Sequence, residues 1–249
     1  KASKVGIGAV TIQNSTHAGM MAYHSMRAMK HDMIGYAITG GGAIMNPTYG
    51  AEPRLGSVPH TWAVPAGKMP PFVLDISSSS VAANKIGLLR RTGAKLLPGL
   101  LAEEDGTPIM DEREVPEQAN LLPWGSTRKL GSHKGYGMAV IGQGFTGILS
   151  SGIFGLSDPP GNSSQFVAAF SIDAFRDVAE FKDSMDEFLT YLVDTPPAKG
   201  HDRVFYAGLP EFEETEIRER DGIPLHREVV EWFDSATEDL KLEPLDRKS

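Results

Sequence analysis

Short apolar runs rich in β-branched residues alternate along this chain with longer segments of helical periodicity, and this alternation limits the folds that the chain can adopt. We expect strands at Val5–Ile12, Ile34–Thr39, Thr61–Val64, Phe72–Ile76, Phe166–Ile172 and Val204–Tyr206. We expect helices at Ser15–Lys30, Ser79–Arg91, Lys134–Leu149, Ala174–Val193 and His226–Leu240. Strands and helices in alternation bury their apolar faces as packed layers, so the sequence predicts a layered α/β domain.

The composition narrows the class of protein further. The 249 residues are 41% hydrophobic and 22% charged, which is sufficient for a sizeable core. The formal net charge of -8 argues against nucleic acid or an anionic membrane as the main partner. No apolar run reaches about 18 residues, so we expect no transmembrane helix. The absence of cysteine excludes disulfides and thiolate chemistry, and we expect a cytoplasmic protein.

A glycine-rich stretch, Gly131-Ser-His-Lys-Gly-Tyr-Gly137, is the most informative local pattern. Three glycines allow a ligand to approach the backbone closely. Lys134 can contact a phosphate or carboxylate, and His133 can donate or accept a proton. The pattern therefore indicates an anionic cofactor or substrate, although a glycine-rich turn with a solvated lysine would read the same way.

A second glycine string, Gly142-Gln-Gly-Phe-Thr-Gly147, has the spacing of a dinucleotide-binding fingerprint. Its context does not fit that function. A short Ser/Gly-rich segment follows it, Pro159 soon ends that segment, and no acidic residue lies about 20 positions beyond. We interpret this string as coincidental.

Three histidines, His17, His24 and His31, are spaced by seven residues. On one continuous helix they would share a face, but each step rises about 10 Å along the axis. Zinc–nitrogen bonds are only about 2 Å long, so these rings cannot share one ion. We expect no metal site.

Two residues at expected strand ends are candidates for chemistry. His17 follows the first expected strand and stands in the first turn of an expected helix, where α/β proteins often bind ligands. A solvated histidine in an N-terminal capping cluster is the alternative. Asp75 ends the run Pro71-Phe-Val-Leu-Asp75, and it either caps a turn or accepts a hydrogen bond from a ligand hydroxyl.

Six segments taken together resemble one family. They are Asn14-Ser-Thr-His17-Ala-Gly, Ile34-Gly-Tyr-Ala-Ile, Leu55-Gly-Ser-Val-Pro59, Phe72-Val-Leu-Asp-Ile-Ser77, Gly131-Ser-His-Lys-Gly-Tyr-Gly137 and Asp221-Gly-Ile-Pro-Leu225. In this order they resemble the malate/L-lactate dehydrogenase-type oxidoreductases, which lack a Rossmann domain and include ureidoglycolate and sulfolactate dehydrogenases. The resemblance covers nearly the whole chain, residues 1–249, as one NAD(P)-binding oxidoreductase domain.

The resemblance implies hydride transfer between NAD or NADP and a small 2-hydroxy or 2-oxo (or 2-imino) acid such as malate or lactate. It also implies an α/β fold with a mixed β-sheet flanked by helices, not a Rossmann fold, and a homodimer with its site near the subunit interface. His17 matches the histidine that is the family's proposed proton acceptor. Cofactor contacts are implied at Gly41, Asp75, Ile76, Ser77, His133, Lys134, Gly135, Gly208, Leu209 and Pro210.

The chain departs from the family pattern in three places. Gly56-Ser-Val-Pro59 stands where the family has Gly-Thr-Asn-Pro, and Gln143 replaces an acidic residue. The family's first hundred or so residues, which carry a Ser-His-Gly motif and an arginine, have no counterpart ahead of Lys1. We therefore expect a truncated chain, and the alternative function is a non-catalytic remnant that binds a dinucleotide or only dimerises.

Overall fold

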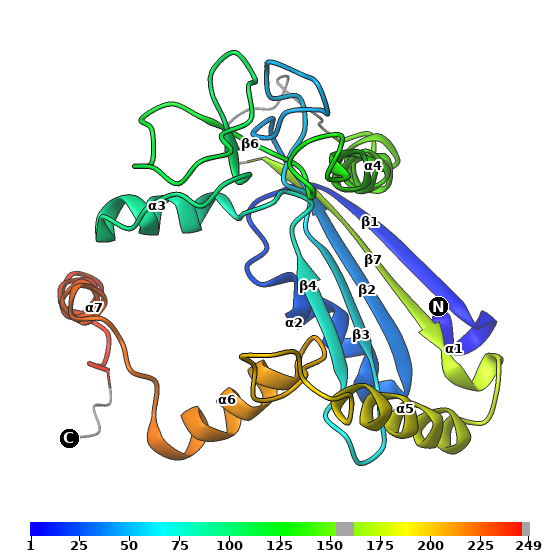
Figure 1. Cartoon of the computed structure of the whole chain (residues 1–249). Coiled ribbons are helices and arrows are strands. Elements are labelled where there is room, and N and C mark those ends of the chain that lie inside the picture. The colour runs from blue at the N-terminus through cyan, green and yellow to red at the C-terminus, as the bar shows by residue number, and fades with distance from the viewer. Residues whose placement is uncertain (153–161, 246–249) are drawn as a thin grey trace. The chain divides into compact units, whose positions relative to one another are not determined.

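A computed structural model of the chain describes residues 1–152 and 162–245. The chain divides into two compact units, Lys1–Ala207 and Gly208–Ser249 (Figure 1). The first unit carries the sheet and the core, and the second consists of two helices and their connections. The two units are described separately.

The first unit is built on a five-stranded sheet of described residues in the order β1-β7-β2-β3-β4 (Figure 1). Its members are β1 (Ile7–Ser15), β2 (Met33–Gly40), β3 (His60–Val64), β4 (Phe72–Ile76) and β7 (Ser163–Ser171). Each neighbouring pair in this sheet is antiparallel. A small second sheet pairs β5 (Leu101–Ala102) with β6 (Asn120–Leu121). The predicted layered α/β architecture without a Rossmann fold is confirmed, with strands that run mostly antiparallel.

The helices of the first unit are α1 (Ala2–Val5), α2 (Met21–Met26), the 3-10 helix η1 (Arg27–His31), α3 (Ala83–Thr92), α4 (Ser132–Gln143), the π-helix η2 (Gly144–Ile148), the 3-10 helix η4 (Ile172–Ala174) and α5 (Val178–Val193). The second unit contains α6 (Leu209–Asp221) and α7 (Arg227–Leu240).

Helices cover both faces of the sheet, and alternating residues of β2 show which helix lies on which face. A Cβ at Gly35 would lie 1.9 Å from the carbonyl oxygen of Ser25, so α2 packs directly on this face. Ile38 points to the opposite face, where a Cβ at Gly142 of α4 would lie 2.6 Å from its Cδ1 atom. The sheet is therefore the middle of three layers, with α2 on one face and α4 with η2 on the other.

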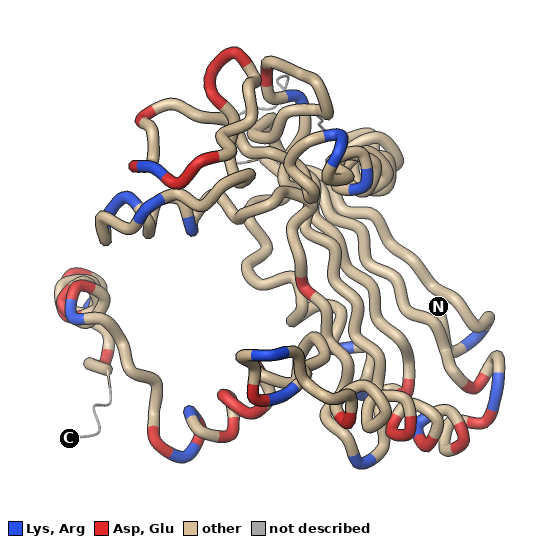
Figure 2. Tube along the Cα trace, viewed as in Figure 1, with Lys and Arg blue, Asp and Glu red and all other residues tan. Residues whose placement is uncertain are grey.

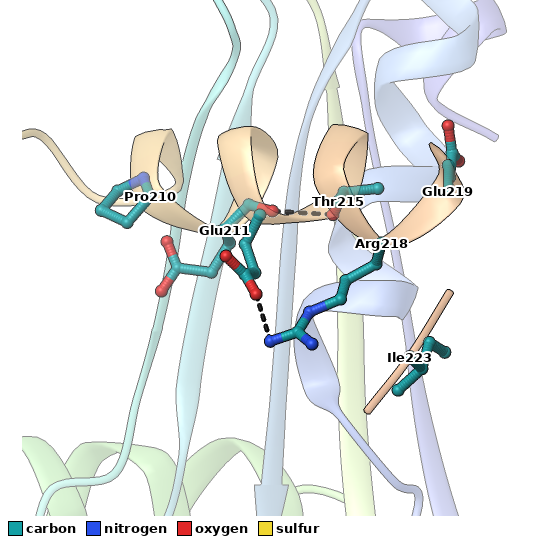
Figure 3. Close-up of a pocket in the computed structure, with 7 residues that line it drawn as sticks. Pro210, Glu211, Thr215, Arg218, Glu219 and Ile223 are labelled. Carbon is teal, nitrogen blue, oxygen red and sulfur yellow. Dashed lines mark hydrogen bonds and ion pairs between the residues drawn. The ribbon is translucent and has the colours of Figure 1, made fainter. Parts of the chain in front are cut away.

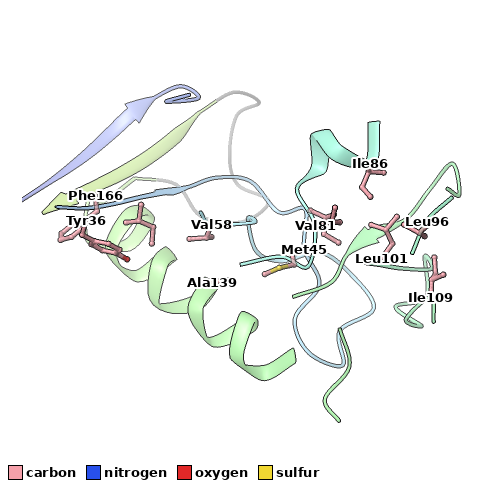
Figure 4. Close-up of a cluster of buried hydrophobic side chains, with 12 residues drawn as sticks. Tyr36, Met45, Val58, Val81, Ile86, Leu96, Leu101, Ile109, Ala139 and Phe166 are labelled. Atoms are coloured by element: carbon pink, nitrogen blue, oxygen red, sulfur yellow. The ribbon is translucent and has the colours of Figure 1, made fainter. Parts of the chain in front are cut away.

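The buried hydrophobic cluster extends from the sheet into the loops beyond its end (Figure 4). Tyr36 and Phe166 belong to the strands, whereas Met45, Leu101 and Ile109 come from the connections and the small sheet. Ile38, Met45 and Leu101 are each at most 2% exposed. The core thus continues past the sheet and supports the loops that leave its end.

A buried chain of polar groups joins β2, β3 and α4. The Tyr36 hydroxyl lies 2.9 Å from Nδ1 of His60, and Nε2 of His60 lies 3.0 Å from the Met138 carbonyl oxygen. This carbonyl can only accept, so Nε2 carries the ring proton and Nδ1 accepts from the tyrosine. Burial lowers the pKa of His60, although the Met138 bond opposes this, and burial raises the pKa of Tyr36 to about 12. Both groups are therefore neutral in the folded protein.

Helix α5 is attached to the connection between β3 and β4 by one carboxylate. The two oxygens of Asp186 accept backbone hydrogen bonds from Gly67, Lys68 and Met69 at 2.9, 2.7 and 3.0 Å. Burial alone would raise the pKa of this carboxyl, but the three N–H donors hold the pKa below its ordinary value. Lys182, one turn earlier, pairs with Asp32 at 2.5 Å.

Most expected elements are present, with three corrections. The helix expected at Ser15–Lys30 is wrong over its first six residues, because β1 continues to Ser15 and α2 begins only at Met21. The strand expected at Val204–Tyr206 is also wrong, because this segment pairs with no strand in the described part of the sheet. Helix α6 is not among the expected elements, because a run of charged residues such as Glu213–Asp221 is equally typical of a solvated surface. The two prolines and the glycine of Ser157–Ser164 predict a loop there; its positions up to 161 lie outside the described residues, and β7 begins at Ser163.

We expect the buried histidine to make the fold sensitive to mild acid. Because the folded state lowers the pKa of His60, the unfolded chain binds a proton first, and stability falls as pH drops below about 6.5. Urea unfolding of the wild type should therefore show a lower free energy of unfolding near pH 5.5 than near pH 7.5. His60→Gln should lose less stability over the same interval, and an equal loss in both proteins would contradict the assignment to His60.

Candidate functional site

Three predicted site segments leave the sheet at the same end. Strand register pairs Ser15 with Ser163, Gly40 with Ser164, and His60 with both Ile38 and Ile76. The strands β1, β2 and β4 therefore run in the same direction, separated by β7 and β3, which run the other way. His17, Gly41 and Ser77 each follow one of these three strands. All three residues therefore lie at the same end of the sheet in the first unit.

The end of β4 and the beginning of α4 are joined through Trp124. The backbone N–H of Trp124 donates to the Ser78 carbonyl at 3.1 Å, and its indole N–H donates to the Ser77 carbonyl. Gly135 lies against this junction, because a Cβ there would be 2.3 Å from the Trp124 nitrogen. The structure thus brings the predicted segments 75–77 and 133–135 together, and Gly135 serves close packing of the chain on itself.

The first turn of α4 presents positive charge. His133 and Lys134 are exposed, and a guanidinium nitrogen of Arg128 donates to Nδ1 of His133 at 3.0 Å. Neither Lys134 nor Arg128 forms an ion pair with a described residue. Lysine and arginine at the start of a helix suit the phosphates of a dinucleotide. This donor set fits NAD or NADP.

Gly41 lies over a buried glutamine that the sequence interpretation had noted only as a departure. Nε2 of Gln143 lies 3.5 Å from the Gly41 carbonyl oxygen, whereas its Oε1 atom is buried without a hydrogen-bond partner. The acidic residue usual in the family could not donate to this carbonyl unless protonated. A Cβ at Gly41 would meet nothing within 4 Å, so space is open above its backbone.

Asp75 has one of the two functions that the sequence left open, since it caps a turn, and one of its carboxylate oxygens is available for the other. Among the residues of the five described strands, it is the one Asp, Glu, Lys or Arg (Figure 2). Its Oδ2 atom accepts from the Ala22 N–H at 2.8 Å and so caps the first turn of α2. Burial raises the pKa of Asp75, and the Ala22 bond opposes this shift. Oδ1 has no partner among the described residues and can accept from a ligand hydroxyl.

His17 lies in the loop between β1 and α2, not in the first turn of a helix as expected. Ser163 and Gln165 donate side-chain hydrogen bonds to the Thr16 carbonyl at 2.7 and 3.2 Å, which hold this loop beside β7. The Gly19 N–H donates to Nδ1 of His17 at 3.0 Å. The ring is exposed, and in its neutral form this bond places the proton on Nε2. His17 therefore offers a donor at Nε2 in the described conformation.

The Ser57-Val58 segment, where the chain departs from the family pattern, is strained. Val58 is 1% exposed and has a φ of 33°, which is unfavourable for a β-branched residue. Asparagine tolerates this region better. The conformation directs the Ser57 carbonyl toward Ser78, whose N–H and hydroxyl both donate to it at 2.6 and 2.7 Å. The strained valine thus helps to fix the segment that follows β4.

The remaining predicted residues, Gly208, Leu209 and Pro210, begin α6 in the second unit. Gly208 has a φ of 96° and precedes the first helical residue, as a glycine can. A shallow pocket of about 790 Å³ lies along α6 beside Pro210 (Figure 3). Arg218 pairs with Glu214 on its surface, and Thr215 donates to the Glu211 carbonyl at 2.7 Å.

Two kinds of site are absent from the part of the chain that the structure describes. No group of three or more His, Asp or Glu side chains has an arrangement that could hold a metal ion. The expected row of histidines is divided, because His17 lies in a loop, His24 in α2 and His31 in η1. None of the described helices has the length and apolar composition that a membrane span requires.

Comparison with known proteins places this chain in one family. Residues 1–234 match the family described as malate/L-lactate dehydrogenase. The chain belongs to this family, which confirms the resemblance found in the sequence.

Individual relatives agree with this class. The malate dehydrogenase of Pyrococcus abyssi is 32% identical over 237 residues, which are 93% of this chain and 65% of that protein. The malate/(S)-sulfolactate dehydrogenase of Methanothermus fervidus is 31% identical over 98% of this chain and 70% of its own length. The chain thus spans about two thirds of the length of these relatives.

Solved structures show the same fold. The malate dehydrogenase of Pyrococcus horikoshii superposes with a TM-score of 0.85 at 29% identity, covering 98% of this chain and 68% of that one. The malate dehydrogenase of Entamoeba histolytica gives 0.90 at 26% identity, with 99% and 72% covered.

We expect Asp75 to stabilise α2 through its hydrogen bond. Asp75→Ala should lower the free energy of unfolding by about 1 kcal/mol at neutral pH, as loss of a helix cap does. Asp75→Asn keeps an acceptor and should cost less. Because burial raises the pKa of Asp75, ionisation opposes folding at neutral pH, and this penalty disappears as pH falls toward about 3.8. Wild type should therefore gain stability relative to Asp75→Asn on acidification, and the opposite trend in urea titrations would contradict this.

Proposed function

We propose that this chain carries the cofactor-binding and proton-transfer residues of an NAD(P)-dependent dehydrogenase of small 2-hydroxy or 2-oxo acids. Its relatives are named malate, lactate and sulfolactate dehydrogenases. The observation that supports this most directly is the convergence of His17, Gly41 and segment 75–77 at one sheet end. Residues 1–249 would act as one oxidoreductase domain.

The proposed cofactor residues are those that the family resemblance implies, and the chemistry of several described groups supports them. Lys134 and His133 at the start of α4 would hold the phosphates, and Oδ1 of Asp75 would accept from a ribose hydroxyl. Gly41, Ile76 and Ser77 would provide close backbone approach, and Gly135 would hold the start of α4 against the segment that follows β4. Gly208, Leu209 and Pro210, which belong to the second unit, are proposed as cofactor contacts from the family resemblance alone. When bound, the nicotinamide supplies the hydride acceptor or donor. NAD and NADP both remain consistent with this set.

His17 is the proposed proton-transfer residue. Oxidation of a hydroxy acid releases the hydroxyl proton as the hydride leaves C2, and an imidazole is suited to accept it. Nε2 can take this proton only if it is unprotonated, which requires the other tautomer and loss of the Gly19 bond to Nδ1. In the reduction, a protonated ring returns the proton to the carbonyl oxygen. The exchange of the Gly19 bond is therefore part of the proposed cycle.

The assembly and location are also proposals. Exposed apolar side chains follow α4 and η2, at Val140, Ile141, Phe145, Ile148 and Leu149, and such a surface is typical of an interface. We propose a homodimer that uses this surface, located in the cytoplasm, with no nucleic acid or membrane as partner. The other class of function is a non-catalytic remnant, which would bind a dinucleotide or dimerise without turnover.

Absorbance assays of the full chain with NADH and NADPH test the function against a panel of 2-oxo acids that includes oxaloacetate, pyruvate and sulfopyruvate. We expect turnover with at least one acid. His17→Ala should lower kcat by at least about a hundredfold with little change in cofactor affinity. Lys134→Ala should instead weaken cofactor binding by about tenfold or more.

Two results would contradict parts of this proposal. Cofactor binding without turnover of any acid would favour the non-catalytic remnant. A His17→Ala variant with kcat within about tenfold of wild type and a raised KM would give His17 a positioning function only.

A further inference from the structure

One face of the sheet is only partly covered by helix. Helix α2 packs over β2 and β3, where Gly35 and Ala37 point toward it. Strand register places Val10 of β1 and Val167 of β7 on the same face, beside Ala37. Val10 is 46% exposed and Ile12 is 40% exposed, which is unusual for β-branched residues of a sheet. These side chains form an apolar platform next to α2.

The platform is the floor of a cavity of about 880 Å³. Ala2 and Ser3 of α1 line one side, and residues of α2 and η1 line the other. A volume of this size is within the range of small-molecule and cofactor sites, which is about 300–1,000 Å³. The cavity also borders Gly8, Met33 and Ala169, which lie toward the opposite end of the sheet from His17 and Gly41. The cavity also reaches toward the loop that carries His17, because Ile12 and His24 line it and Nε2 of His24 lies 3.1 Å from the Ala18 carbonyl oxygen.

Basic side chains line the helical side of this cavity. His24, Arg27 and His31 follow one another at intervals of three and four residues, so they share one side of α2 and η1. Lys30 lines it as well. The carboxylate that borders the cavity, Asp32, is paired with Lys182 at 2.5 Å and is thus compensated. Arg27 and Lys30 thus bring two positive charges to this cavity, in a chain whose formal net charge is -8.

We propose that this cavity binds a small organic phosphate with a flat apolar body, the body lying on Val10 and Val167 and the phosphate facing Arg27 and Lys30. The exposed apolar floor favours the body, since burial of apolar surface stabilises the complex. The guanidinium and ammonium groups favour the dianion. This site does not depend on the proposed dehydrogenase function.

The probe for this site is 1-naphthyl phosphate, followed by its fluorescence in a titration of the full chain. Inorganic phosphate and 1-naphthol, the two halves of the probe, serve as comparison ligands. We expect the intact probe to bind at least about tenfold more tightly than either half. Its affinity should fall with added salt, because exposed charges are screened.

Two variants separate the contributions of charge and floor. Arg27→Gln with Lys30→Gln should weaken binding of the probe at least about tenfold, and so should Val10→Asp on the edge strand β1. Lys85→Gln, on the exposed surface of α3, is the matched control and should leave the affinity unchanged. Circular dichroism melting of each variant shows that the fold is retained.

Three outcomes would overturn the proposal. The first is a double variant that binds the probe within about twofold of wild type. The second is inorganic phosphate that binds as tightly as the probe, which would indicate a simple anion-binding surface. The third is a dimer in light scattering that the double variant and Val10→Asp both dissociate, because a second copy of the chain would then occupy this face.

Discussion

The hydrogen-bonded chain from Tyr36 through His60 to the Met138 carbonyl fixes the position of α4 on the sheet. Met138 lies one turn beyond Lys134 in α4. The neutral His60, which is hydrogen-bonded both to Tyr36 of β2 and to Met138, therefore positions the cationic start of this helix. Removing one member would leave a buried polar group unpaired, which costs about 1–3 kcal/mol. Gly135 and Trp124 then connect the same helix to the end of β4. The candidate site thus depends on a polar contact in the core beneath it.

The topology explains how an antiparallel sheet can gather chemistry at one end. In parallel α/β sheets, ligands bind at the carboxyl ends of neighbouring strands. Here β1, β2 and β4 run in one direction, while β7 and β3 between them run in the other. The loops that follow three strands consequently emerge together, without any pair of parallel neighbours in the five described strands. The residues predicted from strand ends therefore lie at one end of the sheet, although the neighbouring pairs are antiparallel.

The local sequence pattern predicted an element correctly where interactions between neighbouring residues determine the structure. The run Phe72–Ile76 forms β4 with the expected bounds, and α7 begins one residue after its expected start. The local pattern gave a wrong prediction where contacts with residues distant in the sequence determine the structure. Residues 15–20 have a helical pattern, but Ser163 and Gln165 hold Thr16 in a loop, and no local pattern contains those partners. The family was found from six motifs in order, and the comparisons confirm it. The functions of individual site residues are still predictions, although the structure brings several of them together.

The glycine string Gly142–Gly147 ends α4 and continues into the π-helix η2. A Cβ at Gly142 would lie 2.4 Å from Cγ1 of Val58 and 2.6 Å from Cδ1 of Ile38, so this glycine allows a helix to approach a strand. A glycine that allows a pyrophosphate to approach the backbone cannot be distinguished from it in the sequence. The direction of the missing side chain distinguishes the two, since it points at protein in one case and at ligand in the other. A fingerprint defined only by spacing will therefore also select helices that are tightly packed on a sheet.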